Sequence, residues 1–341
     1  MTINRSADAL RQAMQAPFPA HDAEVAQFYQ LQEYHLGWRD EQLRLHDADG
    51  GKLLRPHFCL LACQAVGGAP EQALPLAAAI QLLHDFTLVH DDIEDRSPTR
   101  RGRPTVWSQV GVPLAINVGD GMFALAQLAL LRLADAGVPG DVVVEIARSF
   151  NQTTLRICEG QHLDIGFEDR LDISEADYLA MISRKTAALI AAAFGLGAIL
   201  GQGSSAQTKA LYDFGEALGL AFQIEDDILG IWGDPALTGK PAAHDIWSRK
   251  KSLPIIRALA SAEPDDVAAL ERVYRQPELS ADDVAAVLAI LDRAGSQGYT
   301  AGVARFYHDE ALAALGRIEG GEAAALGELR ALTSQLLGRV K

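Results

Sequence analysis

Four acidic residues lie close together after an almost uncharged stretch that ends near residue 90. Asp91, Asp92, Glu94 and Asp95 fall within five residues, after a run from 74 to 89 that is rich in Ala and Leu. Side chains four residues apart share one face of a helix, so Asp91 and Asp95 would stack about one turn apart. Two stacked carboxylates repel each other unless a cation lies between them. The spacing therefore predicts a site for a hard divalent cation such as Mg²⁺.

Basic residues and a second acidic pair extend this chemistry. Arg100 and Arg101 follow the first cluster, and guanidinium groups bind phosphate oxygens through paired hydrogen bonds. Asp226 and Asp227 form a second pair at the end of another apolar stretch. A solvated helix face is the alternative interpretation of any single cluster. The recurrence of the pattern favours a site for a magnesium-bound phosphate ester.

The composition favours a helical protein with a large core. The chain has 341 residues, of which 49% are hydrophobic and 6% aromatic, and Ala and Leu dominate the apolar part. A net charge of −15 argues against nucleic acid or an anionic membrane surface as the main partner. Cys59 and Cys63 lie one helical turn apart in apolar sequence, where reduced core thiols are expected.

Targeting signals do not stand out in the sequence. The first residues, MTINRSADALRQAM, lack the apolar core of a signal peptide. The run at 186–201 comes nearest to a membrane span, but it is rich in Ala and Gly and short for that role. We therefore expect a cytoplasmic protein without an integral membrane segment.

Periodicity and turn signals predict one all-α domain over residues 1–341. Residues 1–20 contain Pro17 and Pro19 and are expected to form a loose lead-in. A helix is expected from about 21 to 45, and another opens at GGKLLRP and stops at Gly67 and Gly68. The helix with the first acidic cluster comes next, and the chain after Pro254 reads as short amphipathic helices. Further helices are expected at about 112–136, 139–165, 174–202 and 205–231.

The ordered motifs resemble those of the trans-prenyltransferases, the short-chain polyprenyl diphosphate synthases. They run from Gly50 to Pro254 and read GGKLLRP, LLHDFTLVHDDIEDRSPTRRGRPTVW, CEGQHLDIGFEDR, RKTAAL, FQIEDDILGIWGD, TGK and RKKSLP. The resemblance implies the isoprenoid synthase fold, an antiparallel helix bundle around a deep central cavity, and a homodimer. The sequence around TGKP and RKKSLP is similar to that of a bacterial geranylgeranyl diphosphate synthase subgroup.

The reaction of that family has clear physical requirements. An allylic diphosphate loses its diphosphate, so negative charge grows on the leaving group while a carbocation forms. Mg²⁺ ions between carboxylates and phosphate oxygens would stabilise this charge, together with Arg and Lys side chains. The cation must then meet the double bond of isopentenyl diphosphate and not water, which requires a dry apolar cavity.

The resemblance implies a role for each matching residue. Asp91, Asp95 and Asp226 would bind Mg²⁺, and the catalytic group would also include Asp92, Asp227 and Lys185. The allylic diphosphate would be held by Arg100, Lys185, Thr186, Gln223, Lys240 and Lys250. Isopentenyl diphosphate would be bound by Lys52, Arg55, His84 and Arg101.

Two positions depart from the family pattern. Leu53 stands where the first motif commonly has an arginine, although Lys52 and Arg55 remain. Gly230 stands where the second motif commonly ends in a third aspartate, and Asp234 lies one turn further if the helix continues. The first departure leaves the isopentenyl subsite with its other basic residues, and the second puts a metal-binding role for residue 230 in doubt.

Product length is expected to depend on Phe86 and Thr87. Helix rise places Phe86 about 7.5 Å from Asp91 along the axis, but about 140° around the helix, so geometry alone does not put its ring in the cavity. In the family, an aromatic residue five positions before the first aspartate limits the product. FTLVHDD resembles geranylgeranyl synthases, which predicts a C20 product, with farnesyl diphosphate, the C15 product, as the alternative.

Other functions on the same fold are a class I terpene cyclase, a head-to-head prenyl synthase and a non-catalytic synthase subunit. A cyclase has no need of an isopentenyl subsite, whose residues this chain retains. A non-catalytic subunit would be expected to lose acids from its motifs, and only the optional third aspartate is missing here. Chain elongation is therefore the preferred interpretation.

Overall fold

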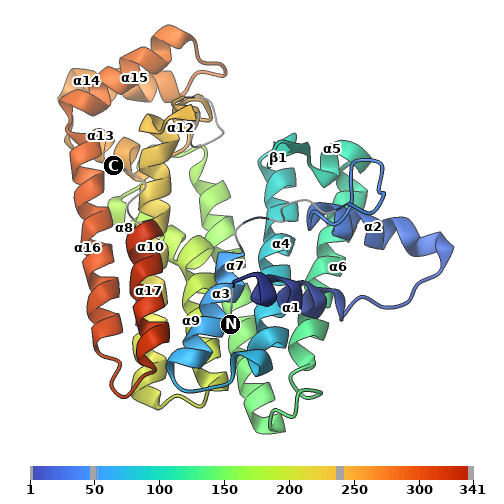
Figure 1. The fold of residues 1–341 in the computed structure, drawn as a ribbon. Coiled ribbons are helices and arrows are strands. Elements are labelled where there is room, and N and C mark those ends of the chain that lie inside the picture. The colour runs from blue at the N-terminus through green and yellow to red at the C-terminus, as the bar shows by residue number, and fades with distance from the viewer. Residues whose placement is uncertain (1–2, 47–50, 52, 236–241, 337–341) are drawn as a thin grey trace. The chain divides into compact units, whose positions relative to one another are not determined.

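Helices account for nearly all the regular structure of the chain (Figure 1). The computed structural model describes residues 3–46, 51, 53–235 and 242–336. The strands among these residues form one two-stranded hairpin, which confirms the predicted all-α class. By their contacts the residues group into two compact units, with unit 1 being Met1–Asn151 and Ala193–Ser204, and unit 2 being Gln152–Ala192 and Ser205–Lys341.

Unit 1 is built around the helix that carries the first acidic cluster. Residues 76–80 of this helix are fully buried, because helices pack against it from several sides. The elements up to residue 131 are α1 (Ile3–Gln15), η1 (Ala23–Val25), α2 (Ala26–His35), α3 (Leu54–Ala65), η2 (Pro70–Ala73), α4 (Leu74–Glu94), β1 (Thr99–Arg100), β2 (Arg103–Pro104), α5 (Val106–Val110) and α6 (Val112–Leu131).

Glycines of α6 allow α4 and α2 to pack closely against it. A Cβ atom at Gly119 would lie 2.3 Å from the ring of His90, and one at Gly121 would lie 2.2 Å from Phe28. Larger residues at either position would therefore push neighbouring rings away from α6. Cys59 and Cys63 are buried free thiols in α3, as expected from the sequence.

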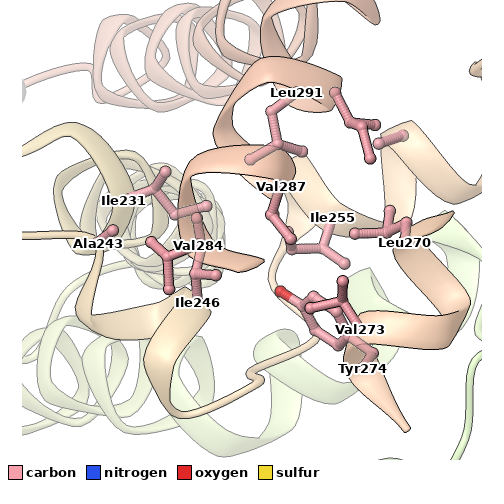
Figure 2. Packing of buried hydrophobic residues seen from close by; sticks show 12 residues of the cluster. Ile231, Ala243, Ile246, Ile255, Leu270, Val273, Tyr274, Val284, Val287 and Leu291 are labelled. Atoms are coloured by element: carbon pink, nitrogen blue, oxygen red, sulfur yellow. The ribbon is translucent and has the colours of Figure 1, made fainter. Parts of the chain in front are cut away.

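Unit 2 is organised around α10, which packs along α16. One apolar cluster of this unit joins α10, α12 and the short helices that follow, and it includes Ile231, Ile246, Tyr274 and Val284 (Figure 2). The elements from residue 140 onwards, of which residues 140–151 and 193–204 belong to unit 1, are α7 (Gly140–Phe167), α8 (Glu175–Ile182), η3 (Ser183–Ala187), α9 (Ala188–Leu200), α10 (Ser205–Trp232), α12 (His244–Trp247), α13 (Leu253–Ser261), α14 (Pro264–Tyr274), α15 (Ala281–Arg293), α16 (Ser296–Gly316) and α17 (Ala323–Leu336).

The N-terminal expectations were wrong in two places. The lead-in expected over 1–20 contains α1, because Leu10 and Met14 are one turn apart and are buried where α1 packs on α4. The helix expected from 21 to 45 ends at His35, shortly before Gly37 with its positive φ of 82°. Beyond it the Asp40 carboxylate accepts hydrogen bonds from the backbone N–H groups of Gln42 and Arg44, which stabilises a turn.

Among the residues that the structure describes, three helical stretches are long and apolar enough to cross a membrane by length and composition alone, whereas the sequence had drawn attention only to 186–201. They are Pro70–Glu94, Val112–Leu131 and Glu175–Leu200. The protein itself buries 61% and 67% of the most apolar window in the first and third. The figure is 44% for the second, so α6 leaves much of its apolar surface uncovered by the rest of the chain.

Candidate active site

The first acidic cluster lies at the C-terminal end of α4. Asp91 is half-buried, Asp92 is 2% exposed, and Asp95 caps the helix with an exposed side chain. The Asp95 N–H donates to the Asp91 carbonyl at 2.8 Å, so helical geometry continues to the cap. The helix stops there because Arg96 adopts a positive φ of 51°. Oxygen ligands at this helix end suit a hard cation, so the residues present are compatible with Mg²⁺.

A hairpin returns Arg100 to the acidic cluster. Arg101 and Gly102 form its turn, both with positive φ, as a two-residue hairpin turn that matches strand twist requires. Arg100 Nε donates to the two carboxylate oxygens of Asp92 at 2.9 and 3.0 Å, and Arg100 Nη2 lies 3.9 Å from Asp91 Oδ2. Burial raises the pKa of Asp92 more than the Arg100 charge lowers it. Asp92 thus holds the guanidinium of Arg100 beside Asp91.

The loop around the hairpin is fixed by side chains from α2 and α5. The Tyr34 hydroxyl donates to the Pro104 carbonyl at 2.6 Å, and the Arg103 guanidinium lies 4.1 Å from the centre of the Tyr34 ring. Trp107 Nε1 and Thr105 Oγ1 both donate to the Ser97 carbonyl, at 2.8 and 2.9 Å. These contacts hold in place the hairpin that carries Arg100 and Arg101, and none of them involves those two arginines.

Residues predicted to bind isopentenyl diphosphate also come together in unit 1. Arg55 Nη1 lies 3.3 Å from His84 Nε2. Burial, followed by the charges of Arg55, Arg101 and Arg100, holds the pKa of His84 well below its usual value, so its imidazole is neutral and can accept from Arg55. A Cβ atom at Gly51 would lie 3.0 Å from Arg101 Nη2, so this guanidinium lies over the Gly51 backbone. Lys52 is outside the described residues.

Phe86 and Thr87 lie on α4 one to two turns before Asp91. The Phe86 ring lies 4.9 Å from the His90 ring and 5.4 Å from the Phe123 ring of α6, measured between centroids. Thr87 Oγ1 donates to the His84 carbonyl at 2.7 Å. The Phe86 ring therefore packs between two other rings on the side of α4 that meets α6.

Unit 2 positions Lys185 and Thr186 on a turn of π-helix. The segment Ser183–Ala187 winds wider than an α-helix, a distortion that is frequent at functional sites. Lys185 Nζ lies 2.5 Å from Asp164 Oδ2 of α7. The approach of α7 depends on Gly160, where a Cβ atom would lie 2.2 Å from the Lys185 backbone nitrogen.

A continuous hydrogen-bonded chain joins Thr186 to Lys250. Thr186 Oγ1 donates to Gln223 Oε1 at 2.9 Å, and Gln223 Nε2 donates to Asp227 Oδ1 at 3.2 Å. Lys250 Nζ donates to the same Asp227 oxygen at 2.9 Å. The sequence predicted these residues from three separate motifs, and the structure brings all of them into one polar network.

The two aspartates of the second motif differ in their surroundings. Asp227 is fully buried, and its second carboxylate oxygen accepts from the Tyr178 hydroxyl and from the Leu253 N–H at 3.2 Å. Asp227 thus accepts hydrogen bonds from four donors, so its role is to organise the residues around it. Asp226, one position earlier on α10, is exposed, so its carboxylate can serve as an oxygen ligand for Mg²⁺.

Three parts of the predicted site stay predictions, namely the positions of Lys52 and Lys240, the metal site and the role of each substrate-binding residue. Lys240 is outside the described residues, like Lys52. Among the residues that the structure describes, no group of three or more His, Cys, Asp or Glu side chains is close enough to hold a metal ion by itself. The roles of the predicted substrate-binding and metal-binding residues are inferred from the resemblance and the contacts above.

Sequence reasoning missed residues that organise the predicted ones. Asp164 pairs with Lys185, Tyr178 donates to Asp227, and Asp245 lies 3.7 Å from Lys250. Asp164 lies within the recognised stretch CEGQHLDIGFEDR, so the motif could have drawn attention to it. Tyr178 carries no local signal, because its partner Asp227 lies 49 residues further along the chain, and Asp245 lies outside the recognised motifs.

Comparison with known proteins finds extensive similarity. The polyprenyl synthetase family matches residues 40–291. The short chain isoprenyl diphosphate synthase of Methanothermobacter thermautotrophicus is 44% identical over 75% of this chain and 77% of its own length. The geranylgeranyl diphosphate synthase of Mycobacterium tuberculosis is 41% identical over 77% of this chain and 74% of its own. The (2E,6E)-farnesyl diphosphate synthase of Mycobacterium bovis is 38% identical over 84% and 79% of the two chains.

Solved structures agree with these relatives. A polyprenyl synthetase from Streptomyces coelicolor superposes with a TM-score of 0.89 at 34% identity, covering 98% of each chain. A geranylgeranyl pyrophosphate synthase from Corynebacterium glutamicum, complexed with isoprenyl diphosphate and magnesium, has a TM-score of 0.84 at 28% identity over 97% of each chain.

Proposed function

Since the chain belongs to the polyprenyl synthetase family and is a prenyltransferase of the all-α isoprenoid synthase fold, we propose that it makes geranylgeranyl diphosphate. It condenses isopentenyl diphosphate with an allylic diphosphate, head to tail. The observation that carries this proposal is the grouping of Arg55, His84 and Arg101 in unit 1. A terpene cyclase does not need this second anion subsite.

The network of unit 2 holds the allylic diphosphate. Lys185 and Lys250 each present an ammonium that a carboxylate already orients, so little conformational entropy remains to be lost when a phosphate binds. Thr186 and Gln223 add neutral hydrogen-bonding groups to the same network. Mg²⁺ would supply further positive charge at the diphosphate oxygens; the residues that would hold it are Asp91 and Asp95 in unit 1 and Asp226 in unit 2.

The isopentenyl diphosphate is held by Arg55, Arg101 and the neutral His84. In the reaction the allylic C–O bond breaks, and its electron pair leaves with the diphosphate. The isopentenyl double bond then attacks the allylic carbon, and a proton is lost to restore a double bond. Fixed cations at both diphosphates orient the two carbon chains for this step.

A homodimer is part of the proposal. The most exposed large apolar side chains of α6 include Leu114, Leu128 and Leu131, which are 52%, 49% and 53% exposed. Exposure of this kind along one very apolar helix marks an interaction surface, and a second copy of the chain is the occupant we propose. Light scattering in solution should report the mass of two chains.

Product length provides the direct test. The purified chain is incubated with isopentenyl diphosphate and geranyl or farnesyl diphosphate, and the dephosphorylated products are separated by chromatography. We expect a C20 alcohol as the main product. A C15 product would favour farnesyl synthesis, in line with the Mycobacterium bovis relative, and a cyclic hydrocarbon would favour a terpene cyclase.

A further inference from the structure

The space beside Gly230 is filled by a carboxylate from another helix. Gly230 lies on α10 four residues after Asp226, one helical turn further along the same face. A Cβ atom at Gly230 would lie 2.3 Å from Oδ2, 2.4 Å from Cγ and 2.6 Å from Oδ1 of Asp245. Such distances are well inside van der Waals contact, so no residue larger than glycine fits unless Asp245 moves. The missing third acid of the motif and the presence of Asp245 are therefore linked.

The direction of Asp245 is fixed by apolar packing. Asp245 lies on α12 and is 5% exposed. Its neighbour Ile246 is fully buried, and Ala243 is 5% exposed, in the cluster that also contains Ile231 and Tyr274 (Figure 2). The carbonyl of Asp245 accepts from the Lys250 N–H at 2.9 Å, so the same residue closes the turn that leads to Lys250.

The Asp245 side chain also acts on the Lys250 ammonium. Lys250 Nζ lies 3.7 Å from Asp245 Oδ2 and 2.9 Å from Asp227 Oδ1. Burial alone would lower the pKa of Lys250, but the charges of Asp227 and then Asp245 outweigh it and raise the pKa above its ordinary value. The ammonium thus stays charged and is held between two buried carboxylates.

We propose that Asp245 is a positioning residue that supplies, from α12, the carboxylate that α10 lacks at Gly230. It fixes the Lys250 ammonium for the allylic diphosphate, and glycine at 230 is required because the carboxylate occupies that space. The inference rests on the proposed function, since Lys250 is assigned there to the allylic substrate. Asp234 is the rival source of a third carboxylate, but α10 ends at Trp232 and Asp234 is exposed beyond it.

Steady-state kinetics test the positioning role. Asp245→Asn keeps the shape of the side chain and removes its charge. It should raise the KM for the allylic diphosphate about 10-fold or more, as expected for a charge-assisted contact, while the KM for isopentenyl diphosphate changes less than about twofold. The matched variant Asp234→Asn should leave both values within about twofold. An unchanged allylic KM in Asp245→Asn, a fall in kcat alone, or the larger effect in Asp234→Asn would overturn the proposal.

Thermal unfolding tests the steric link without any enzyme assay. Gly230→Ala should lower the unfolding midpoint by at least about 2 °C in the native background. The same substitution should have a much smaller effect in an Asp245→Ala background, where the space is empty. Equal losses in both backgrounds would overturn the link. This measurement keeps its meaning even if the wild-type chain fails to transfer prenyl groups, which would refute the proposed function alone.

Discussion

At the scale of single residues, three of the predicted phosphate-binding cations are held by carboxylates within their own unit. Arg100 pairs with Asp92, Lys185 with Asp164, and Lys250 with Asp227. Asp92 and Asp227 are buried, so these pairs orient the cations before a substrate binds. Removing the cation from a buried pair also leaves its carboxylate uncompensated, which costs stability as well as binding.

Asp91→Ala should nearly abolish turnover while the fold persists. Asp91 is half-buried at a helix end beside Arg100, and it is assigned to the metal that stabilises the leaving diphosphate. Loss of one such stabilising group typically lowers kcat about 10²-fold or more. Glu94→Ala, an exposed acid in the same turn, is the matched control and should retain most activity. Activity of Asp91→Ala within a few-fold of wild type would contradict the metal assignment.

The two diphosphate subsites should be separable by mutation. Arg55→Ala should raise the KM for isopentenyl diphosphate, because Arg55 lies beside His84 in unit 1. Lys185→Ala should raise the KM for the allylic diphosphate, because Lys185 belongs to the network of unit 2. Each change should be about 10-fold or more, as for a charge-assisted hydrogen bond. Equal effects of either variant on both KM values would argue against two subsites.

At the scale of elements, the π-helical turn Ser183–Ala187 is enclosed by glycines of neighbouring helices. Gly160 of α7 faces the Lys185 backbone, and a Cβ atom at Gly219 of α10 would lie 2.6 Å from Ala187 Cα. Close packing on both sides over-determines the turn, which explains how an unfavourable winding persists. The position of Lys185 therefore depends on two glycines of other helices, Gly160 and Gly219.

Gly160→Ala should displace Lys185 and weaken allylic substrate binding. Its Cβ atom would meet the Lys185 backbone nitrogen at 2.2 Å, so the π-helical turn must shift. Gly166→Ala is the matched control on the same helix, where a Cβ atom meets nothing within 4 Å. Gly166 is the second-to-last residue of α7 and has no positive φ, so Gly166→Ala should be close to neutral. Allylic KM values that match between the two variants would refute this role of Gly160.

Phe86→Ala should shift the products to longer chains. The Phe86 ring packs against Phe123 where α4 meets α6, and its removal opens space five residues, about one and a half turns, before Asp91. Loss of a packed aromatic ring also costs about 3 kcal/mol or more of stability, so the variant must be shown to be folded. A folded Phe86→Ala enzyme with unchanged product lengths would place the limit on chain growth elsewhere.

At the scale of the whole molecule, local patterns predicted most helices and the acidic motifs. The helices at 140–167 and 205–232 lie close to the expected 139–165 and 205–231, whereas the helix expected at 112–136 ends at Leu131. Residues 3–15 escaped prediction because two buried side chains, Leu10 and Met14, make a weak pattern. Local sequence also hides the wide turn at Ser183–Ala187, which depends on packing by other helices.

The site shows the same division between local and long-range information. Asp91, Arg100 and Lys185 lie in motifs that can be read along the chain. Their organisation cannot be read in that way, because Asp245 meets Gly230 and Tyr178 meets Asp227 across long sequence separations. The motifs thus singled out residues that come together within each unit, but they did not reveal what holds those residues in place.

Magnesium-dependent prenyl transfer is tested most directly by the rate at which the purified chain incorporates isopentenyl diphosphate as Mg²⁺ is titrated. An allylic diphosphate is present at saturation, and a chelator defines the metal-free point. We expect negligible incorporation without Mg²⁺ and a saturable rise to full turnover as Mg²⁺ is added. The reason is that carboxylates and cationic side chains alone leave the departing diphosphate insufficiently stabilised. Incorporation at the full rate in chelator, or none at any Mg²⁺ concentration by the folded chain, would contradict this expectation.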